Sequence, residues 1–149
     1  MKSSIFLLIV AIILLSGNSV ATTSKITDND EVITCIKKNG EENAECFGQL
    51  DEKSEGDLNK SYEKKLKQLS DYNYENWWMG SKDQKDAMLS AFKENQTEWK
   101  RYRNNYCQVA STGAENTHSY AGTLLSCIIN MNLQRIGDIN KINPDLVEE

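Results

Sequence analysis

The sequence has 149 residues, with 17 basic and 22 acidic side chains and a net charge of −5. This length suffices for one domain with one core, and the negative charge argues against nucleic acid and anionic membranes as partners. Ten acids and three lysines lie within residues 28–57. This uneven charge is typical of a solvated helical surface, or of an acidic face that steers a cationic protein.

The first 21 residues are typical of a secretory signal peptide. Lys2 supplies the positive charge, Ile5 to Leu15 form an unbroken apolar run, and small side chains precede a cleavage point after Ala21. The run is too short to span the ~30 Å core of a bilayer as a helix. We therefore expect a periplasmic or extracellular protein with residues 22–149 as its mature helical domain, which makes no membrane contact after cleavage.

The mature chain has one proline and no β-type alternation, so helix is the expected structure. A flexible leader over residues 22–29 is expected to precede a short helix over 30–38, which Gly40 ends. A long second helix is expected to begin near Glu41. It carries an apolar stripe at spacings that keep one face apolar: Ala44, Phe47, Leu50, Leu58, Tyr62, Leu66 and Leu69.

Residues 70–80 interrupt this pattern. Ser81 and Gln84 fit a capping box that starts a third helix, and this helix is expected to end near Gly113 because glycine tolerates a left-handed conformation. A last helix is predicted over residues 117–141, before Asn143-Pro144. The predicted fold class is all-α, a small antiparallel helical hairpin or bundle stapled by two disulfides.

Four cysteines in an exported chain favour two disulfides over metal ligation. Zinc ligands are usually closely spaced, whereas here the gaps are wide and His118 is the single histidine, so no metal site and no cofactor are expected. Three pairings are possible. We favour Cys35–Cys46 and Cys107–Cys127, because each bridge would brace the join between consecutive helices.

Four local patterns follow one another along the chain. They are Cys35 with Cys46, Asp57-Leu58-Asn59-Lys60-Ser61-Tyr62, Trp99-Lys100-Arg101-Tyr102-Arg103-Asn104-Asn105-Tyr106-Cys107, and Cys127 followed by Gln134-Arg135. Over about residues 35–139 the chain resembles the N-terminal domain family of LprI-type lysozyme inhibitors. That family has two Cys, Leu-Asn-x-x-Tyr, Trp-x-x-Tyr-Arg-Asp-x-x-x-Cys, and Cys followed by Arg. The resemblance implies a helical fold and lysozyme inhibition. Asn104 departs from the pattern, because the family commonly has Asp there.

Most of the matched residues are interpreted as scaffold. Trp99, Tyr102 and Tyr106 share one helical face, so we expect them to pack against Leu58, Tyr62 and Leu66 in a core between the second and third helices. The alternative is that these residues form a binding groove. The polar residues Asn59, Arg103 and Arg135 lie beside these stripes. We expect them to join helices through hydrogen bonds or ion pairs, with Asp57 as one candidate partner; ligand contact is the alternative.

The candidate partner-binding residues are aromatic and lie at the expected tip of the long hairpin: Tyr72, Tyr74, Trp77 and Trp78. Tyrosine and tryptophan commonly anchor protein interfaces. The alternative is that these side chains cap the end of the bundle.

The sequence holds no recognisable constellation of nucleophile and base, phosphate loop or metal ligands, so an enzyme is not expected. The predicted function is that of a binding protein that inhibits a lysozyme-like muramidase by blocking its cleft without a covalent bond. A basic lysozyme would suit an acidic partner of this kind. The alternatives are an immunity-type protein against a periplasmic toxin, or a structural envelope protein with no inhibitory role.

Overall fold

The computed structural model describes residues 25–41, 43–77 and 79–143, and its regular structure there is entirely helical. The all-α prediction is therefore confirmed. The predicted signal peptide, Trp78 and Pro144 lie outside the described residues. The elements in chain order are α1 (Asp30–Asn39), α2 (Ala44–Asp71), η1 (Tyr74–Asn76), α3 (Lys82–Ser111), η2 (Thr112–Ala114) and α4 (Tyr120–Lys141).

Short polar side chains fix where the first three long elements begin. The Asn29 side chain caps α1 by accepting hydrogen bonds from two backbone N–H groups of its first turn. Helix α2 begins at Ala44 and not near Glu41, because the side chain of Asn43 accepts a hydrogen bond from the Cys46 backbone N–H at 2.8 Å. Helix α3 begins after Ser81, whose hydroxyl accepts from the Gln84 backbone N–H at 3.2 Å, as the capping prediction required.

The helices end close to the predicted positions, but the reason for one end and the start of the last helix differ from the prediction. Gly40 ends α1 with φ of 89°, a left-handed backbone that favours glycine. Helix α3 ends near the predicted place, at Ser111, but the predicted reason was wrong. The chain continues as η2, and Gly113 does not take a positive φ. Helix α4 then begins at Tyr120, later than predicted.

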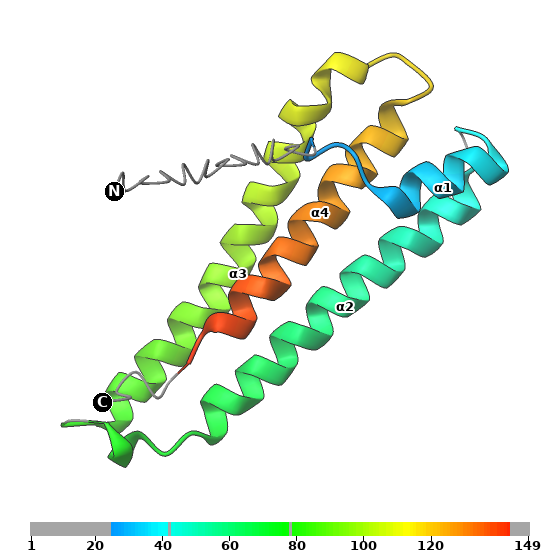
Figure 1. The fold of residues 1–149 in the computed structure, drawn as a ribbon. Helices are drawn as coiled ribbons and strands as arrows, with labels where there is room; N and C mark the ends of the chain where they lie inside the picture. The colour runs from blue at the N-terminus through cyan, green and yellow to red at the C-terminus, as the bar shows by residue number, and fades with distance from the viewer. Residues whose placement is uncertain (1–24, 42, 78, 144–149) are drawn as a thin grey trace, which may run out of the picture.

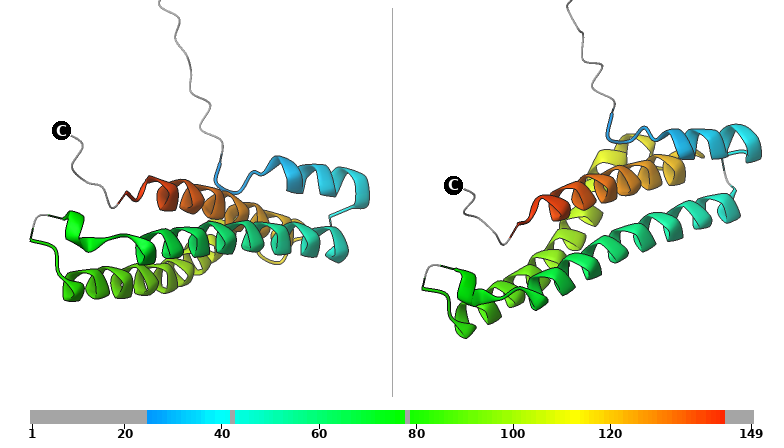
Figure 2. Two further views of the ribbon diagram at one scale, coloured as in Figure 1. Left: turned by 90° about the horizontal axis from the view of Figure 1, so that it is seen from below. Right: turned by 60° about the horizontal axis from the view of Figure 1, so that its bottom comes forward.

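Helix α4 lies between the two long helices (Figure 1). Helices α2 and α3 form an antiparallel hairpin that meets at its tip and diverges away from it. Helix α4 packs against both of them, more extensively than α2 and α3 pack against each other. Helices α1 and α4 lie on the same side of this hairpin (Figure 2). The predicted core between the second and third helices is therefore completed by the fourth.

Three buried clusters follow α4 along its length. The cluster beside α1 joins Val32 and Phe47 to Leu125 and Ile129. The middle cluster surrounds the second disulfide and Met131. The cluster nearest the hairpin tip contains Leu58, Leu69, Phe92 and Ile139, and the ring of Tyr62 stacks on Phe92 with centroids 5.1 Å apart.

The two disulfides connect consecutive helices, and the predicted pairing is confirmed. Cys35–Cys46 joins α1 to α2, with Cα atoms 6.2 Å apart, and Cys107–Cys127 joins α3 to α4, with Cα atoms 5.6 Å apart. Loops of this size contribute about 3 kcal/mol each when closed. Disulfides persist in oxidising compartments, so both bridges favour an exported protein. In the part of the chain that the structure describes, no helix has the length and hydrophobicity that a bilayer crossing requires.

Candidate functional site

The aromatic tip, described at residues 72–77, 79 and 80, contains one stacked pair of rings. The ring of Tyr72 stacks on Trp77 with centroids 5.5 Å apart, and Lys85 Nζ donates to the Tyr72 carbonyl at 2.9 Å. Tyr72, Tyr74 and Trp77 are each half-buried, and a stacked pair leaves less of each ring free for a partner. Their predicted role in binding stays a prediction, and Trp78 lies outside the described residues.

Met79 is a large apolar side chain that the described part of the aromatic tip leaves exposed to solvent. It is 85% exposed and has φ of 54°, which is unusual for a residue of its size. The turn also requires Gly80, since a Cβ atom there would lie 1.9 Å from the Tyr74 carbonyl oxygen. The loop therefore holds an apolar side chain outward at the far end of the hairpin.

Two tyrosines of α3 that were expected in the core are exposed, so that prediction was wrong. Tyr102 is 56% exposed and Tyr106 is 41% exposed, with their ring centroids 5.8 Å apart. Trp99, the third member of the predicted stripe, is half-buried. The buried side chains of α3 are Phe92, Gln96, Arg103, Cys107 and Ser111, and Trp99 packs against the core beside them.

The disulfide explains this difference. Cys107 must point at α4, and Arg103 precedes it by four residues, so both lie on the same face of α3. Tyr106 directly precedes Cys107 and is turned by about 100° away from that face. Using the predicted bridge to orient the helix would have placed Arg103 inside and the tyrosines at the edge.

The exposed tyrosines border a hollow of about 1010 Å³ that runs along α4. We call it the tyrosine hollow. Its walls come from the N-terminal segment, α1, α2, α3 and α4, and they include Ile26, Asp28, Tyr102, Tyr106, Leu133 and Gln134. Ile26, Asp28, Leu133 and Gln134 were not predicted from the sequence as site residues. They come together only through the packing of several helices, which the sequence does not show.

Acidic side chains outnumber basic ones in this hollow. The five acids are Asp28, Asp30, Glu31, Asp57 and Asp138, and the three cations are Lys25, Lys53 and Arg135. Lys53 is shared between Glu31, at 3.5 Å, and Asp57, at 3.8 Å. Among the described residues, Asp28 and Asp30 form no ion pair, so their charges are free to act on a partner.

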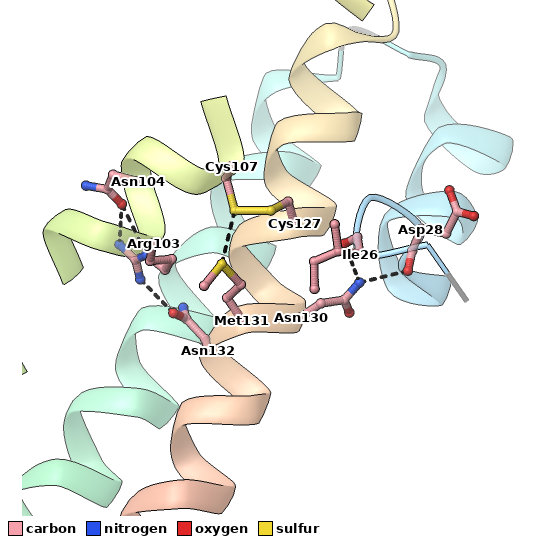
Figure 3. The surroundings of a disulfide bond; sticks show 9 residues. All are labelled: Ile26, Asp28, Arg103, Asn104, Cys107, Cys127, Asn130, Met131 and Asn132. Carbon is pink, nitrogen blue, oxygen red and sulfur yellow. Dashed lines mark hydrogen bonds between the residues drawn. A yellow bond between two sulfur atoms is a disulfide. The ribbon is translucent and has the colours of Figure 1, made fainter. Parts of the chain in front are cut away.

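The N-terminal segment is held against α4, so the predicted flexible leader was wrong for residues 25–29. Asn130 Nδ2 donates to the carbonyls of Ile26 and Asp28, each at 2.8 Å (Figure 3). The buried Asn29 donates to Asn130 Oδ1 at 2.9 Å. These contacts fix the wall of the tyrosine hollow beside the disulfide, where Cys107 Sγ lies 3.6 Å from Met131 Sδ.

Beneath the hollow, Arg103 is buried in a polar cluster that joins three helices. Its guanidinium donates to Glu55 of α2, to Asn132 of α4 at 2.6 Å, and twice to the side chain of Asn104, at 3.1 and 2.9 Å. Asn104 therefore serves as an acceptor where the family commonly has an aspartate. The negative charge comes from Glu55 and not from Asp57, the partner suggested by the sequence.

The pKa of the Glu55 carboxyl is lowered by this cluster. Burial alone would raise the pKa, but the hydrogen bond from Asn132 and the charges of Arg103 and Lys100 outweigh it. Lys100 Nζ lies 3.5 Å from Glu55 and also donates to Asn59 at 3.0 Å. Asn59 thus connects α2 to α3 at the surface.

Arg135 is held by α3 in a similar way. Its Nε donates to Gln96 at 3.0 Å and its Nη2 donates to Asn95 at 2.6 Å. Burial lowers the pKa of Arg135, and Asp138 partly opposes this shift. The Trp99 ring lies close to two guanidinium groups, with Arg135 5.4 Å and Arg103 5.5 Å from its centroid. The matched polar residues therefore form scaffold contacts.

Within the described ranges, no three His, Cys, Asp or Glu side chains are grouped to hold a metal ion. His118 is exposed in the loop between η2 and α4. The hollow offers aromatic rings and carboxylates on a rigid scaffold, an arrangement suited to contacts with another protein.

The chain matches one family model, described as lysozyme inhibitor LprI, over residues 35–139. No curated protein and no solved structure matches the chain. The match covers most of the chain, including both disulfides and the core cluster nearest the hairpin tip. The resemblance seen in the sequence is thus confirmed, and the chain belongs to the lysozyme inhibitor LprI family.

Proposed function

We propose that this protein inhibits a lysozyme-like muramidase by binding it without a covalent bond and blocking its catalytic cleft. The observation that carries the proposal is the match to the lysozyme inhibitor LprI family over residues 35–139. The charge supports it. Lysozymes are typically basic proteins that use carboxylates in a cleft, and a protein of net charge −5 is attracted to a cationic surface.

The aromatic tip is one surface suited to enter a cleft. It lies at the end of the elongated hairpin and presents Met79, which is held outward by the tight turn at Gly80. An exposed apolar side chain on a narrow projection can be buried in a concave site with little rearrangement of the scaffold. Met79→Asn would remove the apolar contact while keeping a residue that tolerates a left-handed backbone.

The deciding experiment is a cell-wall turbidity assay with purified, oxidised protein and lysozymes of several types. We expect the rate of clearing to fall as the protein is added in excess, with at least one lysozyme type. The control is the same protein after reduction and alkylation, which keeps the composition and most of the charge but removes both staples. Clearing at the uninhibited rate with every lysozyme type would refute the proposed function.

A further inference from the structure

We propose that the tyrosine hollow is the docking surface for the positively charged face of the partner, and that it holds an arginine-bearing loop of that protein. The inference rests on the proposed function for its choice of a basic protein as partner. It concerns a surface on the side of the bundle. Tyr102 lies about 30 Å along α3 from the start of that helix beside the aromatic tip, at 1.5 Å per residue.

Exposed apolar side chains are grouped at this hollow. Among the described residues, seven large hydrophobic side chains are exposed, and three of them border the tyrosine hollow: Tyr102, Tyr106 and Leu133. Single exposed hydrophobic residues are ordinary on protein surfaces, whereas several around one depression are typical of interaction sites. Neither tyrosine hydroxyl forms a hydrogen bond to any residue that the structure describes, so both can bond to a partner.

The charge of the hollow suits a cation. Asp28 and Asp30 stand at its wall without an ion pair among the described residues, and Asn130 holds the segment that carries Asp28 in place. A guanidinium can bond to a carboxylate through two N–H groups and also stack on a tyrosine ring. The hollow therefore combines both groups that recognise arginine. A lysine ammonium would be attracted to the carboxylates but could neither form the bidentate hydrogen bond nor stack its plane on a tyrosine ring.

The size and rigidity of the hollow suit a loop. A volume of about 1010 Å³ is large enough for several side chains of one loop. The walls are fixed by the Cys107–Cys127 bridge and by the Asn130 hydrogen bonds. A surface that is already in place loses little conformational entropy on binding, which favours affinity.

The test uses the full oxidised protein and two probes, a basic c-type lysozyme and a fluorescently labelled deca-arginine peptide. The variant of the hollow is Tyr102→Ala with Tyr106→Ala. The matched control is Val109→Ala, which removes a side chain 76% exposed on the same helix but outside the hollow. Met79→Asn tests the aromatic tip in parallel. Thermal unfolding followed by circular dichroism checks that each variant keeps its helices.

We expect the double tyrosine variant to weaken binding of both probes at least tenfold, and Val109→Ala to leave both affinities within twofold of the original. Blocking the arginines of the lysozyme with phenylglyoxal should weaken its binding, whereas acetylating its lysines should weaken it less. Equal affinity of the double tyrosine variant and the original protein would overturn the docking surface. So would a failure of the original protein to bind either probe at low salt.

These outcomes separate the two proposals. If the original protein slows cell-wall lysis and the double tyrosine variant slows it equally, the inhibitory function stands and the docking surface is wrong. If the original protein binds the basic lysozyme through Tyr102 and Tyr106 but never slows lysis by any lysozyme type, the docking surface stands and the inhibitory function is wrong.

Discussion

At the scale of single residues, Arg103 joins three helices through one buried guanidinium. It bonds to Glu55, Asn104 and Asn132, and removing it would leave the carboxylate of Glu55 without its closest cation. Breaking one partner of a buried charged pair usually costs several kcal/mol, because the remaining group keeps its desolvation penalty.

We therefore expect Arg103→Ala to lower the free energy of unfolding by about 3 kcal/mol, as measured by urea unfolding followed by circular dichroism. The control is Lys100→Ala, which removes the other cation near Glu55. Lys100 is partly exposed, so its loss should cost about 1 kcal/mol or less. Equal losses of stability in the two variants would contradict the importance given to the buried pair.

The lowered pKa of Glu55 makes part of the stability depend on pH. A carboxyl group with a lower pKa in the folded state stabilises the protein above its unfolded pKa, and this contribution is lost as the pH falls through the folded pKa. For Glu55 the loss begins as the pH drops below the ordinary value of 4.5.

Glu55→Gln isolates this effect, because glutamine keeps an acceptor oxygen but cannot ionise. We expect the original protein to be more stable than Glu55→Gln at neutral pH, and the gap between their melting temperatures to narrow as the pH falls below 4.5. Melting temperatures measured in steps from about pH 7 to about pH 3 give the comparison. A constant gap across this range would show that ionisation of Glu55 does not contribute.

The sequence could predict that Arg103 needs a partner, but not which one. Glu55 and Asp57 both lie on α2, two residues and therefore about 200° apart around the helix. Which of them faces Arg103 depends on the rotation of α2 about its axis, and that rotation is set by the packing of Leu58 and Leu69 against α3 and α4. No local pattern encodes this choice.

At the scale of helices, the boundaries that the sequence predicted best are those set by local hydrogen bonds. Ser81 and Gly40 act through their own backbone and nearest neighbours, so the start of α3 and the end of α1 were predictable. The end of α3 was predicted at the right place for a wrong reason. The faces of α3 were not predicted, since aromatic spacing alone does not distinguish an inward stripe from an edge stripe.

Helix α4 packs tightly against side chains of α1 and α2 at Gly122. A Cβ atom there would lie 3.0 Å from Ile36 Cδ1 and 3.5 Å from Phe47 Cζ. Gly137 lies farther along the same helix, and a Cβ atom there would have no neighbour within 4 Å. A methyl group can therefore be added at Gly137 without a clash.

Gly122→Leu should destabilise the protein by about 1–3 kcal/mol, because the added side chain overpacks the junction. Gly137→Ala is the matched change on the same helix and should stabilise it by up to about 1 kcal/mol through helix propensity. Chemical unfolding of both variants gives the two values. If Gly122→Leu left the free energy of unfolding unchanged, α1 would be able to move away from α4 at little cost.

At the scale of the whole molecule, the position of α4 was the part of the fold that the sequence did not specify. Apolar stripes indicate which residues are buried. The stripes of α2, α3 and α4 do not indicate which helix packs against both of the others. The two disulfides narrow the choice, since they join α1 to α2 and α3 to α4. The tyrosine hollow follows from this packing and was therefore not predictable from the sequence.

The uneven charge of the molecule gives a kinetic prediction. Salt at about 0.5 M screens charges beyond a few ångströms, whereas salt at about 0.05 M leaves attraction over longer distances. We expect the association rate constant with a basic lysozyme to fall about tenfold between these conditions, with a smaller change in the dissociation rate, in stopped-flow measurements.

In the double variant Asp28→Asn with Asp30→Asn, the association rate constant should depend less on salt than in the original protein. The variant loses two carboxylates that form no ion pair among the described residues. The matched control removes two exposed acids of α3 that lie outside the hollow and form no ion pair among the described residues, Glu94→Gln with Glu98→Gln. An identical salt dependence for the two variants would show that overall charge, and not the hollow, steers association.

The central position of α4 has a consequence for how the chain is made. A ribosome produces α4 last, so α2 and α3 emerge without the helix that packs against both of them. The Cys107–Cys127 bridge also has to wait for that segment. We therefore expect the chain to stay largely unfolded until α4 has been synthesised, because only then can the bundle close and be stapled by its second disulfide.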